Sequence, residues 1–368
     1  MSKRDKQKEL IDNLFVLELA NNHLGSIDRG YKIIDEHSAV AKLHNIKASI
    51  KLQIRDVDNF IHKDYSNGDG SRYIEKTLKT KLSYDDYSLL VDRIIKRDCI
   101  PMATAFDEKS VETCVKLKLP IIKIASSDAN DWPLIEKIAD YDLPVIVSNG
   151  GLSENDLDKV VEYFNKRDKV LAINHCVSLY PSENHELELN QIDYLKNRYT
   201  DNIIGFSSHE YQDWTMSMLI SYAKGARTWE RHIDIDYEDV KVSPYNSRPV
   251  NCNDWYLAYH QAKKLCGSSS LSKRIISIKE TKYLDELVRG VYAKKNINKG
   301  ISIDSNNFND FFYLSIPLKK GQLSCREIIN DTIIIKEIKK DEPLKVDEID
   351  GPLSKNPSIK KLIMNRGV

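Results

Sequence analysis

The sequence predicts a (β/α)₈ TIM barrel followed by a small β-rich domain. Over about the first 265 residues, eight short apolar runs alternate with eight amphipathic stretches, which is the arithmetic of an eight-stranded barrel. Most of the runs are continuously apolar, as in parallel strands that are covered on both faces. The first run is followed by NNHLGS, which has one glycine and no GxGxxG turn, so the competing doubly wound open sheet is disfavoured.

The elements follow one another along the chain. The predicted strands are 14–20, 46–54, 100–105, 120–125, 143–148, 169–177, 202–207 and 227–233. The predicted helices are 27–43, 85–97, 107–118, 131–140, 154–166, 187–198, 212–224 and 253–265. Segment 54–84 is long for a strand-to-helix connection, which is typical of a lid or binding loop, and a disordered surface insertion is the alternative.

The pattern changes near residue 267. GSSSLSKR (267–274) is typical of a polar linker, and the β-rich runs that follow it are separated by turn residues with no long helical pattern. The expected organisation is a barrel over 1–268, a linker over 269–286, a small β domain over 287–352 and a tail over 353–368.

Composition limits the classes of partner. The chain has 55 basic and 55 acidic side chains, so it lacks the electrostatic footprint of a dedicated nucleic-acid binder. No apolar run approaches the roughly 20 residues that span a bilayer, and the polar N-terminus lacks the apolar segment of a signal peptide. We therefore expect a cytoplasmic protein with no nucleic-acid and no membrane partner. Six scattered cysteines without a CxxC pair predict reduced thiols.

Polar groups end every predicted strand, where a barrel places its catalytic residues. Two lysines and four hydroxyl side chains form a set that suits a doubly anionic ligand, such as a phosphate ester bearing a carboxylate. This set is Lys51, Lys123, Thr104, Ser126, Ser148 and Ser207. For any single residue, a solvated strand end is the alternative interpretation.

Two histidines end neighbouring strands. His209 and His232 could bind one divalent metal and leave positions open for substrate and water, beside Glu230. A lone histidine is more often a structural hydrogen-bonding group, but two on adjacent strand ends favour a metal. Glu18 and Glu230 are both candidates for proton transfer.

At this point the motifs resemble those of the sialic acid (nonulosonic acid) synthases. The matching segments, in order, are LELANNHLG, KLQ, LKTKLSYDDYSLLVDR, MATAFDEKSV, PIIKIASSDANDWPLI, VIVSNGGLS, INHCVSLYPS, GFSSHE, WERHI and RGVYAKKNINKG. The last resembles the opening of the family's C-terminal antifreeze-like (SAF) domain, so the resemblance covers nearly the whole chain. It implies a transferase that condenses phosphoenolpyruvate with an aldehyde sugar, N-acetylmannosamine-like or a variant, to give a sialic-acid-like α-keto acid and phosphate.

The resemblance also implies roles for residues. The phosphoenolpyruvate contacts would be Lys51, Thr104, Lys123, Ser126, Ser148, Ser178 and Ser207. His209 and His232 would hold manganese or magnesium, and Glu18, Gln53 and Tyr180 would lie on the acceptor side. In that family the small domain of one subunit reaches over the partner's barrel mouth, which implies a homodimer.

Three departures from the family pattern lie on or near the acceptor side. The family's GPDH-like motif is replaced by Ser243-Pro244-Tyr245, with no aspartate after the proline. Ser208 stands where the family has an acidic residue, and Ile316 precedes the proline that usually follows an SAF arginine. The simplest interpretation is an active synthase with an unusual acceptor sugar.

Two rival interpretations remain. One is a Schiff-base aldolase on the same barrel that uses Lys123 or Lys51 as a covalent nucleophile and needs no metal. The other is a catalytically silent binding protein that kept the fold, which the altered acceptor motifs motivate.

Overall fold

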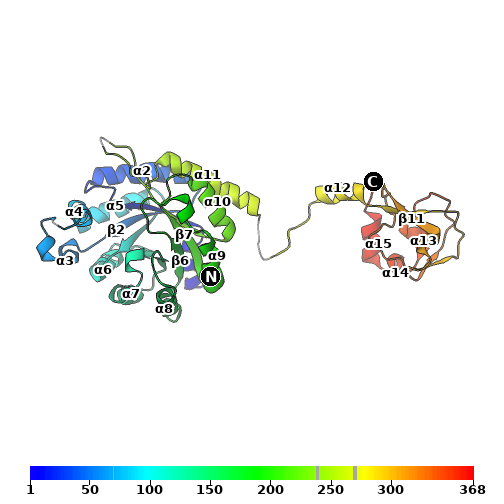
Figure 1. Cartoon of the computed structure of the whole chain (residues 1–368), viewed down its shortest axis with the longest axis horizontal. Helices are drawn as coiled ribbons and strands as arrows, with labels where there is room; N and C mark the ends of the chain where they lie inside the picture. The colour runs from blue at the N-terminus through cyan, green and yellow to red at the C-terminus, as the bar shows by residue number, and fades with distance from the viewer. Residues whose placement is uncertain (69, 238–239, 268–271) are drawn as a thin grey trace. The chain divides into compact units, whose positions relative to one another are not determined.

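The computed structural model describes residues 1–68, 70–237, 240–267 and 272–368, and the chain divides into two compact units, Met1–Ser268 and Ser269–Val368. In the first unit eight parallel strands close into a barrel in the order β1 to β8, with helices around them (Figure 1). Strand β1 pairs with both β2 and β8, so the sheet has no edge. The predicted (β/α)₈ fold is confirmed, and the open-sheet alternative is wrong.

The barrel elements agree closely with the predicted ones. The strands are β1 Leu14–Ala20, β2 Ala48–Ile54, β3 Ile100–Ala105, β4 Ile122–Ile124, β5 Val145–Ser148, β6 Leu171–Cys176, β7 Ile203–Ser208 and β8 Thr228–His232. The main helices are α2 Ile27–Leu43, α5 Tyr84–Lys96, α6 Glu108–Lys116, α7 Trp132–Ala139, α8 Glu154–Asn165, α9 Asn190–Arg198, α10 Trp214–Lys224 and α11 Pro249–Cys266.

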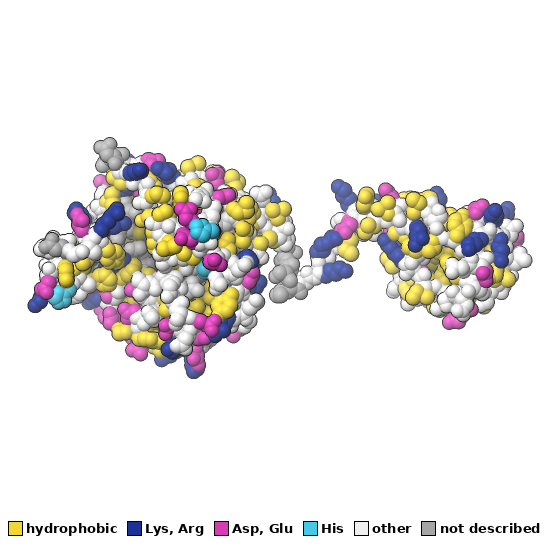
Figure 2. All heavy atoms as spheres, in the orientation of Figure 1, with side chains coloured by type: hydrophobic (Ala, Val, Ile, Leu, Met, Phe, Trp, Pro, Cys, Tyr) yellow, Lys and Arg dark blue, Asp and Glu magenta, His cyan; other side chains and the backbone are white. Residues whose placement is uncertain are grey.

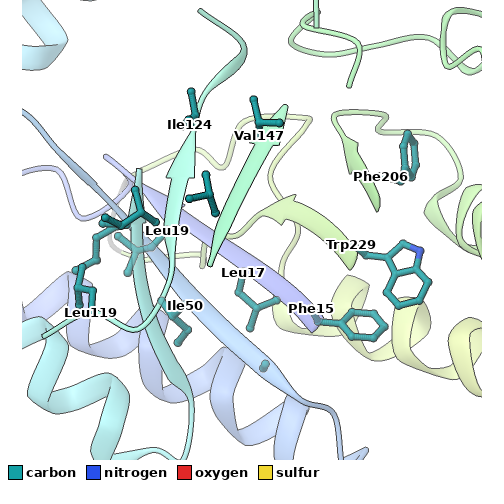
Figure 3. Packing of buried hydrophobic residues seen from close by; sticks show 14 of the residues in the cluster. Phe15, Leu17, Leu19, Ile50, Leu119, Ile124, Val147, Phe206 and Trp229 are labelled. Carbon is teal, nitrogen blue, oxygen red and sulfur yellow. The ribbon is translucent and has the colours of Figure 1, made fainter. Parts of the chain in front are cut away.

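Each barrel strand sends alternate side chains outward and inward. Phe15, Leu17 and Leu19 of β1 belong to the apolar cluster between the strands and the surrounding helices, and Phe15 lies beside Trp229 of β8 (Figure 3). Inward side chains near the N-terminal ends of the strands, here called the lower barrel, form a second apolar cluster that includes Val16. Both faces of the strands are therefore buried, which explains why their sequences are continuously apolar.

A short N-terminal helix, α1 Lys3–Ile11, was absent from the predicted elements. It carries mostly charged residues, so its sequence shows little apolar periodicity. Its Ile11 is buried in the lower barrel cluster, and Gln7 donates a 3.0 Å hydrogen bond to the Asp142 carbonyl in the connection before β5. Helix α1 thus closes the N-terminal end of the barrel and leaves the C-terminal end for ligands.

Segment 54–84 is built mainly of short helices. They are α3 Val57–Phe60, η1 Lys63–Tyr65 and α4 Arg72–Lys79. Ser71 caps α4 by accepting a 3.3 Å hydrogen bond from the Ile74 amide. Over its described residues the segment is ordered, which disfavours a disordered surface insertion. It lies beside the barrel mouth, as a lid or binding loop would.

The second unit has its own apolar core, which includes Val291, Phe312, Leu344 and Ile363. Its strands are β9 Gly290–Ala293, β10 Ser302–Ile303, β11 Phe312–Ser315, β12 Thr332–Ile334 and β13 Ile349–Asp350. Its helices are α12 Ile278–Leu287, α13 Phe308–Phe311, η4 Val346–Glu348, α14 Pro352–Lys355 and α15 Pro357–Met364.

The second unit differs from the expected organisation in two places. The segment expected as a linker, 269–286, contains most of α12, and the expected tail, 353–368, forms α15, whose Ile363 is fully buried in the core. The tail therefore belongs to the small domain, because α15 buries Ile363 in the core of that domain. The expected boundary at residue 268 and the start of the linker lie outside the described residues.

Acidic and basic side chains are interspersed over the face drawn in Figure 2, in line with the net charge of zero. None of the described helices combines the length and the apolar character that a membrane crossing requires.

Candidate active site

A cavity of about 650 Å³ opens at the C-terminal end of the barrel strands. Strand register brings its polar side chains to one level, because Glu18 pairs with Lys51, Thr104 with Lys123 and Ser207 with Glu230 in adjacent strands. All the site residues expected from the sequence line this cavity. They are Glu18, Lys51, Lys123 and Glu230, then Gln53, Thr104, Ser126, Ser148, Ser178, Tyr180 and Ser207, and finally His209 and His232.

Two lysines and two glutamates form a buried ion-pair network at the floor of the cavity. Lys51 contacts the carboxylate of Glu18 and lies 3.1 Å from a carboxylate oxygen of Glu230. Lys123 lies 3.3 Å from the other oxygen of Glu230. Pairing satisfies charges that would be costly to bury alone. The sequence suggested that the set of lysines and hydroxyl side chains is cationic. With the two glutamates paired to the lysines, the net charge of the site is close to zero before a ligand enters.

The network separates the proton affinities of the two carboxyl groups. Burial raises the pKa of Glu18, and the charge of Lys51 opposes this effect. Burial also acts to raise the pKa of Glu230, but the charges of Lys123 and Lys51 outweigh it and lower that pKa to about 2. Glu230 therefore stays ionised near neutral pH, and Glu18 is the carboxyl better suited to take up and release a proton.

The two lysines also differ. Burial is the largest effect on Lys51 and acts to lower its pKa, but the charges of Glu18 and Glu230 together outweigh it, so its pKa is raised. At Lys123 burial dominates and the pKa is lowered.

Hydroxyl groups surround the lysines. Lys51 donates a 2.9 Å hydrogen bond to the Thr104 hydroxyl, and Lys123 donates one of 2.7 Å to Ser148. Ser126 accepts a 3.1 Å hydrogen bond from the Gly150 amide, which leaves its own hydroxyl proton available for a ligand. Lysine amines and hydroxyl groups on one floor form a site for oxyanions.

The two histidines lie side by side at the other edge of the cavity. Their ring centroids are 5.5 Å apart, and the ring of Tyr180 lies 4.0 Å from His209 and 5.7 Å from His232. His209 donates from Nδ1 to the Val177 carbonyl at 2.9 Å, which leaves Nε2 free as a ligand atom. Burial lowers the pKa of His209 to about 4, so the ring is neutral at pH 7.

The chemistry of this pair fits a divalent metal. A neutral imidazole oriented through its other nitrogen is the form that binds metals. Within the described ranges, no cluster of three or more histidine, cysteine or acidic side chains is arranged around a metal position. A metal here would therefore have two protein ligands, and its other positions would be open to substrate and water.

Sequence reasoning missed several residues of the wall. Arg55, Phe60 and Tyr73 come from the segment after β2, and Phe106 follows β3. Asp128, after β4, also lines the cavity. Arg55 stands two positions beyond Gln53, so the alternation along β2 was a signal for it. Phe60 and Tyr73 depend on how segment 54–84 folds back, whereas Phe106 and Asp128 follow strand ends, which the strand-end rule could have included.

Comparison with known proteins shows relatives over most of the chain. The model of the NeuB family matches residues 39–247, which is more than half of the chain. An N-acetylneuraminate-9-phosphate synthase of Drosophila melanogaster is 30% identical over 236 residues, 62% of this chain and 62% of that protein. This chain thus matches about three fifths of the length of that relative.

Two further proteins match over a larger share of their length. A pseudaminic acid synthase of Campylobacter jejuni is 27% identical over 306 residues, 79% of this chain and 84% of that one. A crystal structure from Chromobacterium violaceum, of a protein assigned by name to spore coat polysaccharide biosynthesis, is 30% identical, covers 92% of this chain and 99% of that one, and has a TM-score of 0.88. On the family match and these likenesses, the chain belongs to the NeuB family.

Proposed function

We propose that this chain is a phosphoenolpyruvate-dependent synthase that joins phosphoenolpyruvate to an aldehyde sugar, giving a sialic-acid-like α-keto acid and phosphate. The observation that carries the proposal is the convergence of two buried lysines, two buried glutamates and a histidine pair on one cavity of a NeuB-family barrel. Relatives named N-acetylneuraminate-9-phosphate synthase and pseudaminic acid synthase support an N-acetylmannosamine-like or variant acceptor.

The lysines and hydroxyls would bind phosphoenolpyruvate through its two anionic groups. Lys51 with Thr104 and Lys123 with Ser148 form two cation–hydroxyl pairs, one for the carboxylate and one for the phosphate. Ser126, Ser178 and Ser207 would complete the set. Because these side chains are already desolvated and fixed by their mutual contacts, they hold the enol carbon C3 in one orientation toward the acceptor.

His209 and His232 would hold manganese or magnesium. Such a metal acts as a Lewis acid that polarises an aldehyde oxygen. Tyr180 packs against both histidines, and Gln53 lines the same cavity, so we assign both to contacts with the acceptor sugar.

The bond changes balance without an added oxidant or reductant. C3 of phosphoenolpyruvate forms a bond to the aldehyde carbon, water adds to C2, and phosphate leaves with cleavage of its C–O bond. One of the attacking water's two protons leaves with phosphate as the C2 hydroxyl becomes the keto group, and the other goes to the new hydroxyl group. Glu18, whose pKa burial raises, is placed to relay this proton, whereas Glu230 stays ionised and holds the lysines.

A Schiff-base aldolase requires an amine that is free to attack a carbonyl. Lys51 is held by two carboxylates and its pKa is raised, which argues against it as a nucleophile. The lowered pKa of Lys123 leaves that lysine as the one to test. Borohydride trapping of a covalent adduct with pyruvate, or full activity in chelator, would favour the aldolase.

We extend the proposal to assembly and location. The second unit would be an SAF domain that covers the barrel mouth of a partner subunit in a homodimer, and α12 carries the exposed side chains Ile278 and Tyr283, which are available for such a contact. Truncation after residue 268 should leave a folded barrel with severely reduced activity. A monomeric full-length protein would contradict the dimer. A cytoplasmic location accords with phosphoenolpyruvate as an intracellular metabolite.

The test is phosphate release from phosphoenolpyruvate with Mn²⁺ and a panel of aldoses. Release that depends on both the metal and an aldose supports the synthase. Tight phosphoenolpyruvate binding with no turnover of any aldose would indicate the catalytically silent alternative.

A further inference from the structure

Arg55 lies on the wall of the cavity, where neither the expected phosphoenolpyruvate contacts nor the histidine pair uses it. It follows β2 two positions after Gln53. Its guanidinium carbon lies 3.5 Å from the ring centroid of Phe106 and 5.7 Å from that of Tyr73. Aromatic packing on these rings holds the guanidinium flat and fixes the direction of its donors.

Most of the hydrogen-bonding capacity of Arg55 is unused. Nη1 donates a 3.1 Å hydrogen bond to the Gln53 side chain. Nε is buried without a partner, and across the described residues no acceptor is found for Nη2 either. Lys51 and Lys123 differ from Arg55 in this respect, because both are paired with carboxylates. A buried donor without a partner is costly unless a ligand supplies the acceptor.

Other cations gather near Arg55. Arg72 and Lys76 lie one turn apart on α4. Burial and the charges of Arg72 and Arg55 lower the pKa of Lys76, against the opposing charge of Asp234, which is itself paired with Arg29. In the part of the chain that the structure describes, none of these three side chains forms an ion pair. Asp128 lines the same cavity and its charge acts on Arg55, so one carboxylate opposes these three cations. Among these groups the cations are therefore in excess.

Building on the proposed function, we infer that the acceptor sugar carries an anionic group, a phosphate ester or a carboxylate, away from its aldehyde, and that Arg55 binds this group. The planar guanidinium matches both groups with two parallel donors. Arg55 donates directly to Gln53, which we propose contacts the acceptor, so we assign the anion to the acceptor and not to phosphoenolpyruvate. Arg55 is thus a specificity-determining residue for the acceptor.

The kinetic test compares three acceptors with one skeleton: N-acetylmannosamine, its 6-phosphate and its 6-carboxylate (the uronate). We expect at least one anionic acceptor to have a kcat/KM at least tenfold above that of the neutral sugar. A preference for both anions indicates recognition of charge alone, and a preference for one identifies the group. A higher kcat/KM for the neutral sugar than for both anions would overturn the inference.

The variants are Arg55→Met and Arg55→Lys. Arg55→Met should raise the KM for the preferred anionic acceptor at least tenfold more than the KM for the neutral sugar or for phosphoenolpyruvate. Arg55→Lys should recover part of the loss, because lysine keeps the positive charge but lacks the two parallel donors of the guanidinium. The matched control is Arg167→Met, since Arg167 stacks on Tyr163 at a similar 3.6 Å but lies outside this cavity. Equal losses with all acceptors in Arg55→Met would contradict a role in anion binding.

A binding measurement separates this inference from the proposed function. Borohydride-reduced forms of the neutral and phosphorylated sugars lack the aldehyde and cannot react. Calorimetry with these two probes, in the presence of phosphoenolpyruvate, should show tighter binding of the phosphorylated form to the wild-type chain and loss of that difference in Arg55→Met. If no aldose supports turnover, the proposed function fails, and this binding difference still decides the role of Arg55. Equal binding of the two probes would refute that role.

Discussion

Gly150 faces two hydroxyl groups of the proposed phosphoenolpyruvate site, so adding one methyl group there should damage binding. A Cβ atom at this position would lie 2.2 Å from the Ser178 hydroxyl oxygen and 2.8 Å from that of Ser126. Both distances are far inside van der Waals contact, so in Gly150→Ala the two hydroxyls must move. A hydrogen bond to a charged group contributes about 1.5–3 kcal/mol. Loss of one such bond should raise the KM for phosphoenolpyruvate roughly 10- to 150-fold.

The neighbouring glycine provides a matched control. Gly151 has φ +73°, and nothing lies within 4 Å of its Cβ position. Gly151→Ala should therefore cost about 1–2 kcal/mol of stability through backbone strain while the KM stays near the wild-type value. Initial rates of phosphate release and thermal unfolding of both variants give the two quantities. A wild-type KM in Gly150→Ala, or an equal rise in both variants, would refute the reasoning.

Three further predictions concern charge and metal. Lys123→Met should raise the KM for phosphoenolpyruvate by a factor of about 10 or more through loss of a charged donor, and wild-type affinity in a titration would contradict the assignment. His209→Ala should abolish turnover and Mn²⁺ binding measured by electron paramagnetic resonance, and a rate unaffected by chelator would contradict the metal. Asp35 lies between Arg93 and Arg97, and although burial acts to raise its pKa, their hydrogen bonds lower it to about 2. Since that stabilisation exists above the unfolded pKa and is lost as pH falls through the folded one, Asp35→Asn should lower the Tm at pH 7, and the difference should shrink between about pH 4 and pH 2.

The barrel could be predicted because each strand carries its own signal. Strands such as Leu14–Ala20 and Ile100–Ala105 are buried on both faces, so their apolar runs mark them with the correct bounds. The site followed from the rule that strand ends meet at one mouth. Glu18 and Lys51, 33 positions apart in the sequence, are neighbours because β1 and β2 pair in register.

What escaped prediction depends on contacts between elements with weak local signals. Helix α1 is largely charged and is placed by Ile11 beneath the barrel. The neutralisation of Lys51 and Lys123 depends on the distance of Glu230 from both, which no sequence pattern specifies. Arg55 belongs to the wall because Phe106, which follows the next strand, packs against its guanidinium.

The central claim is that phosphoenolpyruvate C3 forms a carbon–carbon bond to the aldehyde carbon of a sugar in this cavity. The most direct measurement is carbon NMR of the reaction of phosphoenolpyruvate labelled with ¹³C at C3 and an acceptor labelled with ¹³C at its aldehyde carbon, with Mn²⁺ present. The account predicts a product methylene that shows one-bond coupling between the two labels, together with one phosphate released per product. Label that stays in phosphoenolpyruvate with every acceptor, or appears only as the methyl group of pyruvate, would contradict it.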